Sequence, residues 1–305
     1  MPTIYVTEPT AINTALVKES LVDTPYSLVM GDTAYSYGPF PDCETILIRT
    51  GARIDASILD TFPNLASIIR VGTGLDNVDL EFCKAHNVAV FNAPGANAEA
   101  VADYVIATVF AVLRKLHVLE PRDVRSWNRF AFVGKNIASQ IVGIVGFGHI
   151  GRILHDKLYG LGCRIFYVYD PYIKQGASLP KGVQLVSLEQ LLQLSTVVSL
   201  HLPLTDETKY LINHKNVSLL QPSAVLVNAS RGGIVEEAAL LDALKKDQLT
   251  YIADTVENEP QVNEALLATP NAIITPHIAS LTTEAEKAMV RVALENFLHN
   301  RPVQL

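Results

Sequence analysis

The sequence predicts an α/β fold with parallel sheets, divided between two domains. Short apolar runs alternate with helical patterns along the whole chain, which is the order of parallel strands joined by helices. The chain has 305 residues, a length that suggests two domains, and 49% of them are hydrophobic, enough for sizeable cores. A glycine-rich turn also joins one apolar run directly to a helical pattern.

The first third of the chain carries four apolar runs of strand length. They are Thr3–Thr7, Thr45–Ile48, Ser67–Val71 and Val88–Phe91. Helical spacing covers Ser57–Phe62 and Val78–His86 between them. A long helix rich in Ala, Val and Leu is then expected from about Asn97 to Leu119, and its composition favours burial.

The rest of the chain continues the alternation of strands and helices. Its predicted strands are Ile141–Val145, Arg164–Tyr169, Thr196–Leu200, Ala224–Asn228, Tyr251–Asp254 and Ala272–Ile274. A helix begins near Ile150, and capping boxes mark two more helix starts, with Ser187 before Gln190 and Thr283 before Glu286.

The last predicted helix, Thr283 to His299, follows the final strand of the second domain. It places four apolar side chains on one face, those of Met289, Val292, Ala293 and Phe297. This helix can fold back on the first domain and make that domain discontinuous. We therefore expect one domain from 1–98 with 280–305 and another from 99–279.

Composition excludes several classes of partner. A net charge of −7 disfavours nucleic acid and anionic membranes, and no apolar run reaches the length of a membrane span. The three cysteines, Cys43, Cys83 and Cys163, are far apart and have no metal-ligand spacing. No N-terminal targeting signal is visible, so we expect a cytoplasmic protein with reduced thiols and no metal.

The glycine-rich turn, Gly146-Phe-Gly148-His149-Ile150-Gly151, follows a predicted buried strand and opens a helix. In that context the first glycine makes the turn, the second leaves room for a pyrophosphate, and the third lets helix and strand pack closely. The helix N-terminus offers free N–H groups to an anion. These features predict a dinucleotide site, with a purely structural turn as the alternative.

Asp170 supports the dinucleotide interpretation. It ends the second strand of this unit, nineteen positions after Gly151. An acid there hydrogen-bonds the ribose of NAD and repels the extra phosphate of NADP. Pro171 and Tyr172 follow, with no adjacent Arg to receive that phosphate, so NAD is the predicted cofactor.

Four polar segments follow later predicted strands, where ligands of open α/β sheets bind. They are His201–Thr205, Asn228–Gly233, Asp254–Pro260 and Thr275–Ile278. They can bring an Arg, a Glu and a His beside a nicotinamide. A histidine suits proton exchange with a hydroxyl, a carboxylate can orient it, and an Arg can hold a substrate carboxylate. This set suits hydride transfer to and from a 2-hydroxy acid.

From about Thr45 to His299 the chain resembles the D-isomer-specific 2-hydroxyacid dehydrogenases, and among them the 3-phosphoglycerate dehydrogenases most. The resemblance rests on Arg70–Asp79, Asn92–Asn97, the glycine turn with Asp170, and the four segments above. It implies two Rossmann-like domains, the substrate domain being discontinuous, and a homodimer built on the cofactor domains. It implies an NAD-dependent oxidoreductase.

The resemblance also implies roles for particular residues. Arg231 binds and polarises the substrate, Glu259 supports the histidine, and His277 is the acid/base; the family's Glu-Pro ending selects Glu259 over Glu257. The other implied cofactor contacts are Gly146, Gly148, His149, Ile150, Gly151, Asp170, His201, Pro203, Thr208, Ala229, Ser230 and Asp254, together with Arg231 and His277. The implied substrate contacts are Arg49, Arg70, Thr73, Gly74, Asn97 and Arg129, together with Arg231 and His277.

The substrate depends on three arginines. Arg49, Arg70 and Arg129 match positions that surround the substrate phosphate in 3-phosphoglycerate dehydrogenases, so we expect 3-phosphoglycerate and a role in serine biosynthesis. They can also be ordinary surface arginines, in an enzyme that reduces hydroxypyruvate, glyoxylate or another 2-keto acid. Ala279-Ser280 replaces the small Gly-Gly or Ala-Gly common in the family, which bears on substrate size. A third alternative is an NAD(H)-sensing binding protein similar to the family's co-repressors.

Overall fold

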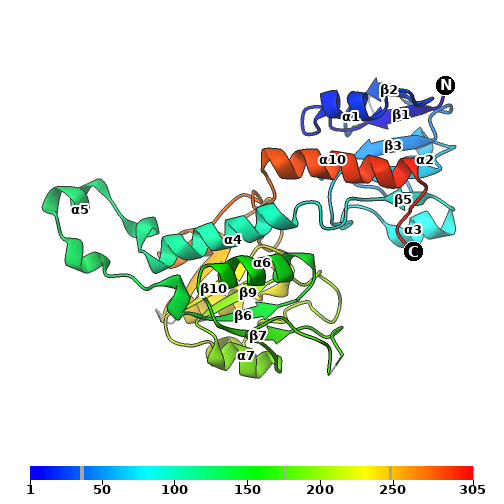
Figure 1. Cartoon of the computed structure of the whole chain (residues 1–305). Helices are drawn as coiled ribbons and strands as arrows, with labels where there is room; N and C mark the ends of the chain where they lie inside the picture. The colour runs from blue at the N-terminus through cyan, green and yellow to red at the C-terminus, as the bar shows by residue number, and fades with distance from the viewer. Residues whose placement is uncertain (35–37, 175, 247–248, 305) are drawn as a thin grey trace. The chain divides into compact units, whose positions relative to one another are not determined.

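The computed structural model describes residues 1–34, 38–174, 176–246 and 249–304, and its fold is α/β with parallel sheets, as the sequence predicts. The chain divides into two compact units, which we call unit 1 (Met1–Ala98 and Leu281–Leu305) and unit 2 (Glu99–Ser280). Each unit is built on its own sheet (Figure 1). The chain therefore crosses between the units twice, at 98–99 and at 280–281.

Unit 1 contains a five-stranded sheet in the order β2-β1-β3-β4-β5, with every neighbouring pair parallel. Its strands are β1 (Thr3–Val6), β2 (Ser27–Met30), β3 (Thr45–Ile48), β4 (Ser67–Arg70) and β5 (Ala89–Phe91). Its helices are α1 (Thr14–Ser20), α2 (Ile58–Thr61), α3 (Leu80–Ala85) and α10 (Thr283–Leu298).

The strands of unit 1 are buried on both faces, which is why they read as continuous apolar runs. In β1, Ile4 and Val6 pack in one core with residues of α1 and α10, such as Phe297. Tyr5 points to the opposite face and packs with Phe62 after α2. The period of two along the strand thus sends alternate side chains into two separate cores.

Unit 2 contains a seven-stranded parallel sheet in the order β12-β11-β10-β9-β6-β7-β8. Its strands are β6 (Ile141–Val145), β7 (Ile165–Tyr169), β8 (Val183–Leu185), β9 (Val197–Leu200), β10 (Ala224–Asn228), β11 (Leu249–Ala253) and β12 (Ala272–Ile274). Its α-helices are α4 (Ala98–Leu113, which starts at the boundary), α5 (Pro121–Ser126), α6 (His149–Gly160), α7 (Leu188–Leu194), α8 (Glu237–Leu244) and α9 (Glu264–Leu267). Short 3₁₀ turns are η1 (Leu116–Val118), η2 (Arg129–Phe132), η3 (Ile137–Ser139), η4 (Val217–Leu219) and η5 (Gly232–Ile234).

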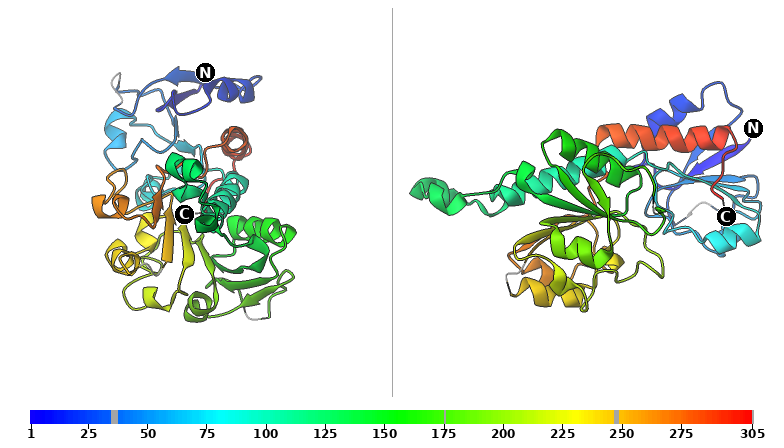
Figure 2. Two further views of the ribbon diagram at one scale, coloured as in Figure 1. Left: turned by 90° about the vertical axis from the view of Figure 1, so that its left-hand side faces the viewer. Right: turned by 60° about the horizontal axis from the view of Figure 1, so that its bottom comes forward.

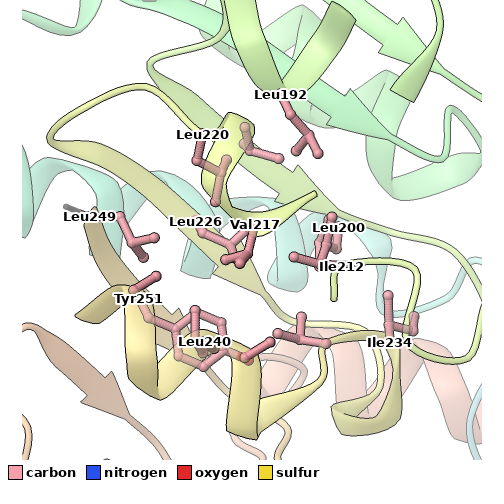
Figure 3. Close-up of a cluster of buried hydrophobic side chains, with 14 of the residues drawn as sticks. Leu192, Leu200, Ile212, Val217, Leu220, Leu226, Ile234, Leu240, Leu249 and Tyr251 are labelled. Carbon is pink, nitrogen blue, oxygen red and sulfur yellow. The ribbon is translucent and has the colours of Figure 1, made fainter. Parts of the chain in front are cut away.

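Helices cover both faces of the unit 2 sheet. On one face, Leu226 and Tyr251 pack against Leu192 of α7 and Leu240 of α8, in the cluster shown in Figure 3. On the other face, Ile144 packs in a cluster with residues of α4 and α6. Burying each such side chain contributes about 1.5–3 kcal/mol, so these two clusters are the main source of stability in the unit.

The chain adds strands to the unit 2 sheet first on one side of β6 and then, from β9, on the other side. From β6 the chain proceeds outward to β7 and β8, and it later returns to the other side of β6 with β9. Loops that leave the carboxyl ends of β6 and β9 therefore separate, and such a switch point is where parallel α/β sheets bind ligands. The glycine turn follows β6, and His201 follows β9.

One segment of unit 2, residues 116–133, stands away from the sheet in Figure 1 and in the right-hand view of Figure 2, and we call it the arm. It includes η1, α5 and the turn η2. Large apolar side chains on it face solvent; Trp127 is 75% exposed and Phe130 is 76% exposed. A single chain therefore displays apolar surface that a packed core would bury.

The structure corrects several sequence-based boundaries. α4 ends at Leu113 rather than near Leu119, because Lys115 adopts a left-handed conformation that stops the helix. The cap of α10 is Thr282, whose side chain accepts from Ala285 N, so the capping box predicted at Thr283 is wrong. The box at Ser187 and Gln190 is confirmed.

Several short elements were not predicted, among them α1, α5, α9, β2 and β8. β2 and β8 are edge strands of three or four residues. Within the described residues, none of the helices is long and apolar enough to cross a membrane.

Candidate active site

The glycine turn has the geometry that a bound phosphate requires. Gly146 has φ +93°, and a Cβ there would lie 2.8 Å from the carbonyl carbon of His201. A Cβ on Gly151 would lie 2.4 Å from the Gly146 carbonyl oxygen, so helix α6 approaches the turn more closely than an alanine allows. A Cβ on Gly148, by contrast, would meet nothing within 4 Å. Close packing therefore requires glycine at 146 and 151. At Gly148 the missing side chain leaves space beside the helix N-terminus, where an anion can bind.

His149 and Ile150 are the first residues of α6, and His149 is exposed. First-turn N–H groups have no acceptor within their own helix, so they are suited to bind an anion. The residues at this turn therefore fit the pyrophosphate of a dinucleotide.

Asp170 is half-buried at the end of β7, beside the glycine turn. Its Oδ2 accepts from Phe147 N at 2.7 Å, and its Oδ1 accepts from Tyr172 N at 2.8 Å. The two bonds hold the carboxylate at the carboxyl edge of the sheet, next to the turn. This is the place at which an acid can accept from a ribose hydroxyl.

The loop after β9 presents a neutral histidine. His201 Nε2 lies 2.8 Å from Ser199 Oγ, and within the described residues its buried Nδ1 has no hydrogen-bond partner. Burial lowers the pKa of His201 to about 3. The imidazole is therefore uncharged at neutral pH and can contact a cofactor without acting as an acid.

Other predicted cofactor residues build these loops. The hydroxyl of Thr208 is buried and donates to the Pro203 carbonyl at 2.6 Å, which braces the loop after β9. Ala229 and Ser230 are mostly buried, and Ser230 Oγ donates to Asn228 Oδ1 at 2.9 Å. Their side chains fix the path of the backbone into Arg231.

Three predicted catalytic side chains belong to three neighbouring loops of unit 2. Arg231 follows β10, Glu259 follows β11, and His277 follows β12. His277 Nδ1 lies 3.0 Å from Glu259 Oε1. The sheet order β12-β11-β10 thus brings together a histidine and a carboxylate that are 18 positions apart in sequence.

The charges of these three residues act on one another. The hydrogen bond that His277 donates to Glu259 raises the pKa of His277, while burial and the positive charge of Arg231 oppose that rise. Burial alone would raise the pKa of Glu259, but the bond to His277 and the charges of His277 and Arg231 lower it overall. Glu259 is therefore ionised, and it favours the protonated form of His277.

The loops of Arg231 and Glu259 are packed backbone against backbone. A Cβ on Gly232 would lie 2.0 Å from the carbonyl carbon of Val256, so only glycine fits there. Arg231 Nη1 donates to the Ser230 carbonyl at 2.7 Å, so the arginine is held against its own loop. A guanidinium is a group that binds carboxylates in a bidentate geometry.

The predicted substrate residues of unit 1 lie at the carboxyl edge of its sheet. Thr73 Oγ1 lies 2.9 Å from both the Ala93 carbonyl oxygen and Asn97 Oδ1, and its one proton can bond either of them, which fixes the loop containing Gly74. Arg49 and Arg70 end neighbouring strands, since Ile48 pairs with Arg70.

The arginines differ in their surroundings. Arg49 donates to the Ala11 carbonyl and lies 4.0 Å from Glu286 of α10. Arg70 is 9% exposed, and its guanidinium occupies the space where Gly72 would carry a Cβ. Arg129 is in the arm of unit 2, over the ring of Phe130 at 5.0 Å. Unit 1 therefore brings two of the three arginines together.

Sequence reasoning missed two polar residues near the histidine. Tyr104 Oη lies 2.6 Å from Thr275 Oγ1, which donates to Asp254 Oδ1 at 2.6 Å. The available signal was a tyrosine among the apolar side chains of α4, since a buried hydroxyl needs a partner. In the described part of the chain no group of His, Cys, Asp or Glu side chains could hold a metal ion.

A dinucleotide turn at a sheet switch point, together with an Arg and a Glu–His pair, is the arrangement that nicotinamide-dependent oxidoreductases use. Residues 106–279 match the family model described as the NAD-binding domain of the D-isomer specific 2-hydroxyacid dehydrogenases. The chain belongs to this family.

Two relatives and one solved structure illustrate the similarity. D-3-phosphoglycerate dehydrogenase of Mycobacterium bovis is 34% identical over 248 residues, covering 81% of this chain and 47% of the relative. Glyoxylate reductase of Thermococcus litoralis is 36% identical over 256 residues, covering 81% of this chain and 77% of the relative. A crystal structure of a protein from Thermus thermophilus superposes with a TM-score of 0.83 at 30% identity, covering 97% and 96% of the two chains. The chain spans about half the length of the phosphoglycerate dehydrogenases that it matches.

Proposed function

We propose that the protein interconverts a D-2-hydroxy acid and its 2-keto acid, with NAD as cofactor and His277 as the acid/base. The observation that carries the proposal is the 3.0 Å contact between His277 Nδ1 and Glu259 Oε1, in the field of Arg231. Because Nδ1 is engaged by Glu259, Nε2 is the nitrogen that can exchange a proton with a substrate. Bound NAD would supply the acceptor for hydride from the alcohol carbon, and bound NADH would supply the hydride for the carbonyl carbon.

Different residues transfer the proton, bind the substrate and hold the cofactor. In the direction of reduction, protonated His277 gives its proton to the carbonyl oxygen, and Glu259 stabilises the charged imidazole beforehand. Arg231 holds the substrate carboxylate and polarises the carbonyl. In the direction of oxidation, neutral His277 takes the hydroxyl proton. Asp170 would hold the ribose, and the first turn of α6 would hold the pyrophosphate.

For the substrate, we propose 3-phosphoglycerate and its keto acid first, with a role in serine biosynthesis. This rests on Arg49 and Arg70, which end adjacent strands and place two positive charges at one edge of unit 1. The relatives named as D-3-phosphoglycerate dehydrogenases agree with it.

A second substrate class is favoured by a specific contact. Arg49 lies 4.0 Å from Glu286, so part of its charge is already compensated. This favours an unphosphorylated 2-keto acid, such as the substrate named for the Thermococcus litoralis glyoxylate reductase.

The experiment is oxidation of NADH by the purified protein with 3-phosphohydroxypyruvate, hydroxypyruvate, glyoxylate, pyruvate and 2-ketoisocaproate, with NADPH in parallel. Preference for the phosphorylated acid supports the two arginines as its site. Preference for another acid supports the second class and leaves the role of His277 standing. Turnover of none of them contradicts the proposal and favours a binding protein.

We also propose a cytoplasmic homodimer. All three cysteines are buried and unpaired, as in proteins of reducing compartments. The arm exposes Trp127 and Phe130, large aromatic side chains that are enriched where protein surfaces associate.

A further inference from the structure

A chain of three side chains leads from helix α4 to the turn that bears His277. Tyr104, in the middle of α4, lies 2.6 Å from Thr275 through their hydroxyl oxygens. Thr275 Oγ1 donates to Asp254 Oδ1 at 2.6 Å. All three belong to unit 2, although Tyr104 and Thr275 are 171 positions apart.

The direction of the hydrogen bonds follows from the groups themselves. An ionised carboxylate only accepts, so Thr275 donates its one proton to Asp254. Thr275 can therefore only accept from Tyr104, whose hydroxyl must donate. Burial and the charge of Asp254 raise the pKa of Tyr104 to about 12, so that proton is present at any pH at which the enzyme would work.

Asp254 also binds the backbone on the far side of the histidine. Its Oδ1 accepts from Ile278 N and its Oδ2 accepts from Ala279 N, each at 2.7 Å. Its own carbonyl accepts from His277 N at 2.9 Å. One residue, itself only 2% exposed, thus holds the three consecutive amides of residues 277–279.

These hydrogen bonds matter because the backbone of His277 is in the left-handed region, with φ +55°. Such a conformation is unfavourable for a non-glycine residue, so the surroundings must impose it. Without the bonds to Asp254, the turn can relax and swing the imidazole away from Glu259. Asp254 therefore maintains the conformation of the turn in which His277 Nδ1 lies 3.0 Å from Glu259 Oε1.

We propose that Tyr104 and Thr275 are positioning residues for His277, acting through the carboxylate of Asp254 on the left-handed turn. Neither hydroxyl touches a reacting atom in this arrangement. The two hydroxyls fix the Asp254 carboxylate in one orientation, in which both of its oxygens accept from backbone amides. This inference rests on the proposed role of His277 as the acid/base.

The test compares Tyr104→Phe with Thr108→Val, a matched control on the same helix. Thr108 also contributes one hydroxyl, but the acceptors within its reach are backbone carbonyls of α4 itself, those of Tyr104 and Val105. The first readout is the pKa of His277, measured by NMR in the resting protein. The groups that act on His277 are Glu259, Asp254 and Arg231, and the bond to Glu259 is the largest influence.

We expect Tyr104→Phe to lower the pKa of His277, because a displaced imidazole loses part of its contact with Glu259. We expect turnover to fall about tenfold, since small displacements of a catalytic group are costly, with KM for NADH unchanged. Thr108→Val should leave both quantities as in the parent. Equal values in the two variants would overturn the proposal.

A second series keeps the test valid if Tyr104→Phe folds poorly. Thr275→Val should reproduce the lowered pKa, and Thr275→Ser, which keeps the hydroxyl, should restore it. If Tyr104 acts through Thr275, the double variant should be no worse than Thr275→Val alone. Additive losses would contradict a shared path. Because the NMR titration needs no turnover, an inactive parent protein would refute the proposed function while this relationship could still be measured.

Discussion

Glu237 and Glu257 each accept the other's backbone N–H, at 2.8 Å from Glu257 N to Glu237 Oε1 and at 3.2 Å from Glu237 N to Glu257 Oε1. Glu237 is the first residue of α8 and is 6% exposed. Burial and the nearby charge of Glu257 raise its pKa, although the amide of Glu257 opposes the shift. The reciprocal pair fastens the loop of Arg231, which leads into α8, to the loop of Glu259.

Replacing Glu237 with Ala should therefore loosen two catalytic loops at once. The half-buried amide of Glu257 would lose its acceptor, which costs up to about 1–3 kcal/mol in the free energy of unfolding. Urea denaturation measures this loss. Glu237→Gln keeps a carbonyl oxygen for the amide and should retain most of the stability.

The neighbouring Glu236 is the control for this prediction. Its carboxylate lies 3.2 Å from the ring of exposed His214 and accepts from the His214 backbone N–H at 3.0 Å, also at the surface. Exposed pairs contribute little, so Glu236→Ala should leave the unfolding midpoint nearly unchanged. Equal destabilisation by the two alanine variants would contradict the reciprocal pair.

The sequence predicted the loops that carry the candidate catalytic residues better than it predicted the contacts that hold these loops. Arg231, Glu259 and His277 follow strands whose apolar runs are long enough to recognise, and strand order then places their loops side by side. The bonds of Asp254 to residues 278 and 279 depend on backbone angles around a left-handed histidine, which no local pattern encodes. The hydroxyl of Tyr104 finds its partner 171 positions away. Side-chain pairs of this kind become visible only when the tertiary fold is known.

The Glu259–His277 contact predicts a pH dependence of keto-acid reduction. His277 has its pKa raised above the ordinary value of 6.5, chiefly by the bond to Glu259. Reduction needs the protonated imidazole, so the rate should be full at low pH and fall as the pH rises through the raised pKa. The contribution of the pair to stability follows the same sign: it is complete below pH 6.5 and is lost as the pH rises through the pKa in the folded protein.

Glu259→Gln should move that fall to lower pH, because the main influence that raises the pKa is removed and burial remains. The measurement is kcat/KM for reduction against pH in the parent and the variant. His277→Ala should lower turnover about 10²–10⁴-fold while NADH binding survives. An unshifted profile in Glu259→Gln would show that the carboxylate does not tune the histidine, and full activity in His277→Ala would remove it from the mechanism.

Asp170 predicts the choice between NAD and NADP. Its carboxylate is fixed by Phe147 N and Tyr172 N, where a second phosphate on the ribose would meet negative charge. Asp170→Asn removes the charge and keeps a carbonyl oxygen, so the ratio of kcat/KM for NADPH to that for NADH should rise about tenfold, as expected for one close like-charge contact. Asp170→Arg should raise the ratio further. A ratio that stays constant in both variants would refute the role in the ribose site.

The arm contains a fluorescent side chain that can report whether two copies of the chain associate. Trp127 is the only tryptophan of the chain, and it is 75% exposed in a single chain. If the arm packs against a second copy, Trp127 emission should shift to shorter wavelength as the protein concentration rises, in parallel with the mass measured by light scattering. Phe130→Glu keeps the tryptophan and places a charge in the contact. A stable interface buries about 1,200–2,000 Å² and excludes unpaired charges. The variant should therefore remain monomeric, and its emission should not depend on concentration. Leu194→Glu alters an exposed apolar side chain at the end of α7, outside the arm, and should associate like the parent. Dimers of Phe130→Glu with the stability of the parent would place the interface elsewhere on the chain.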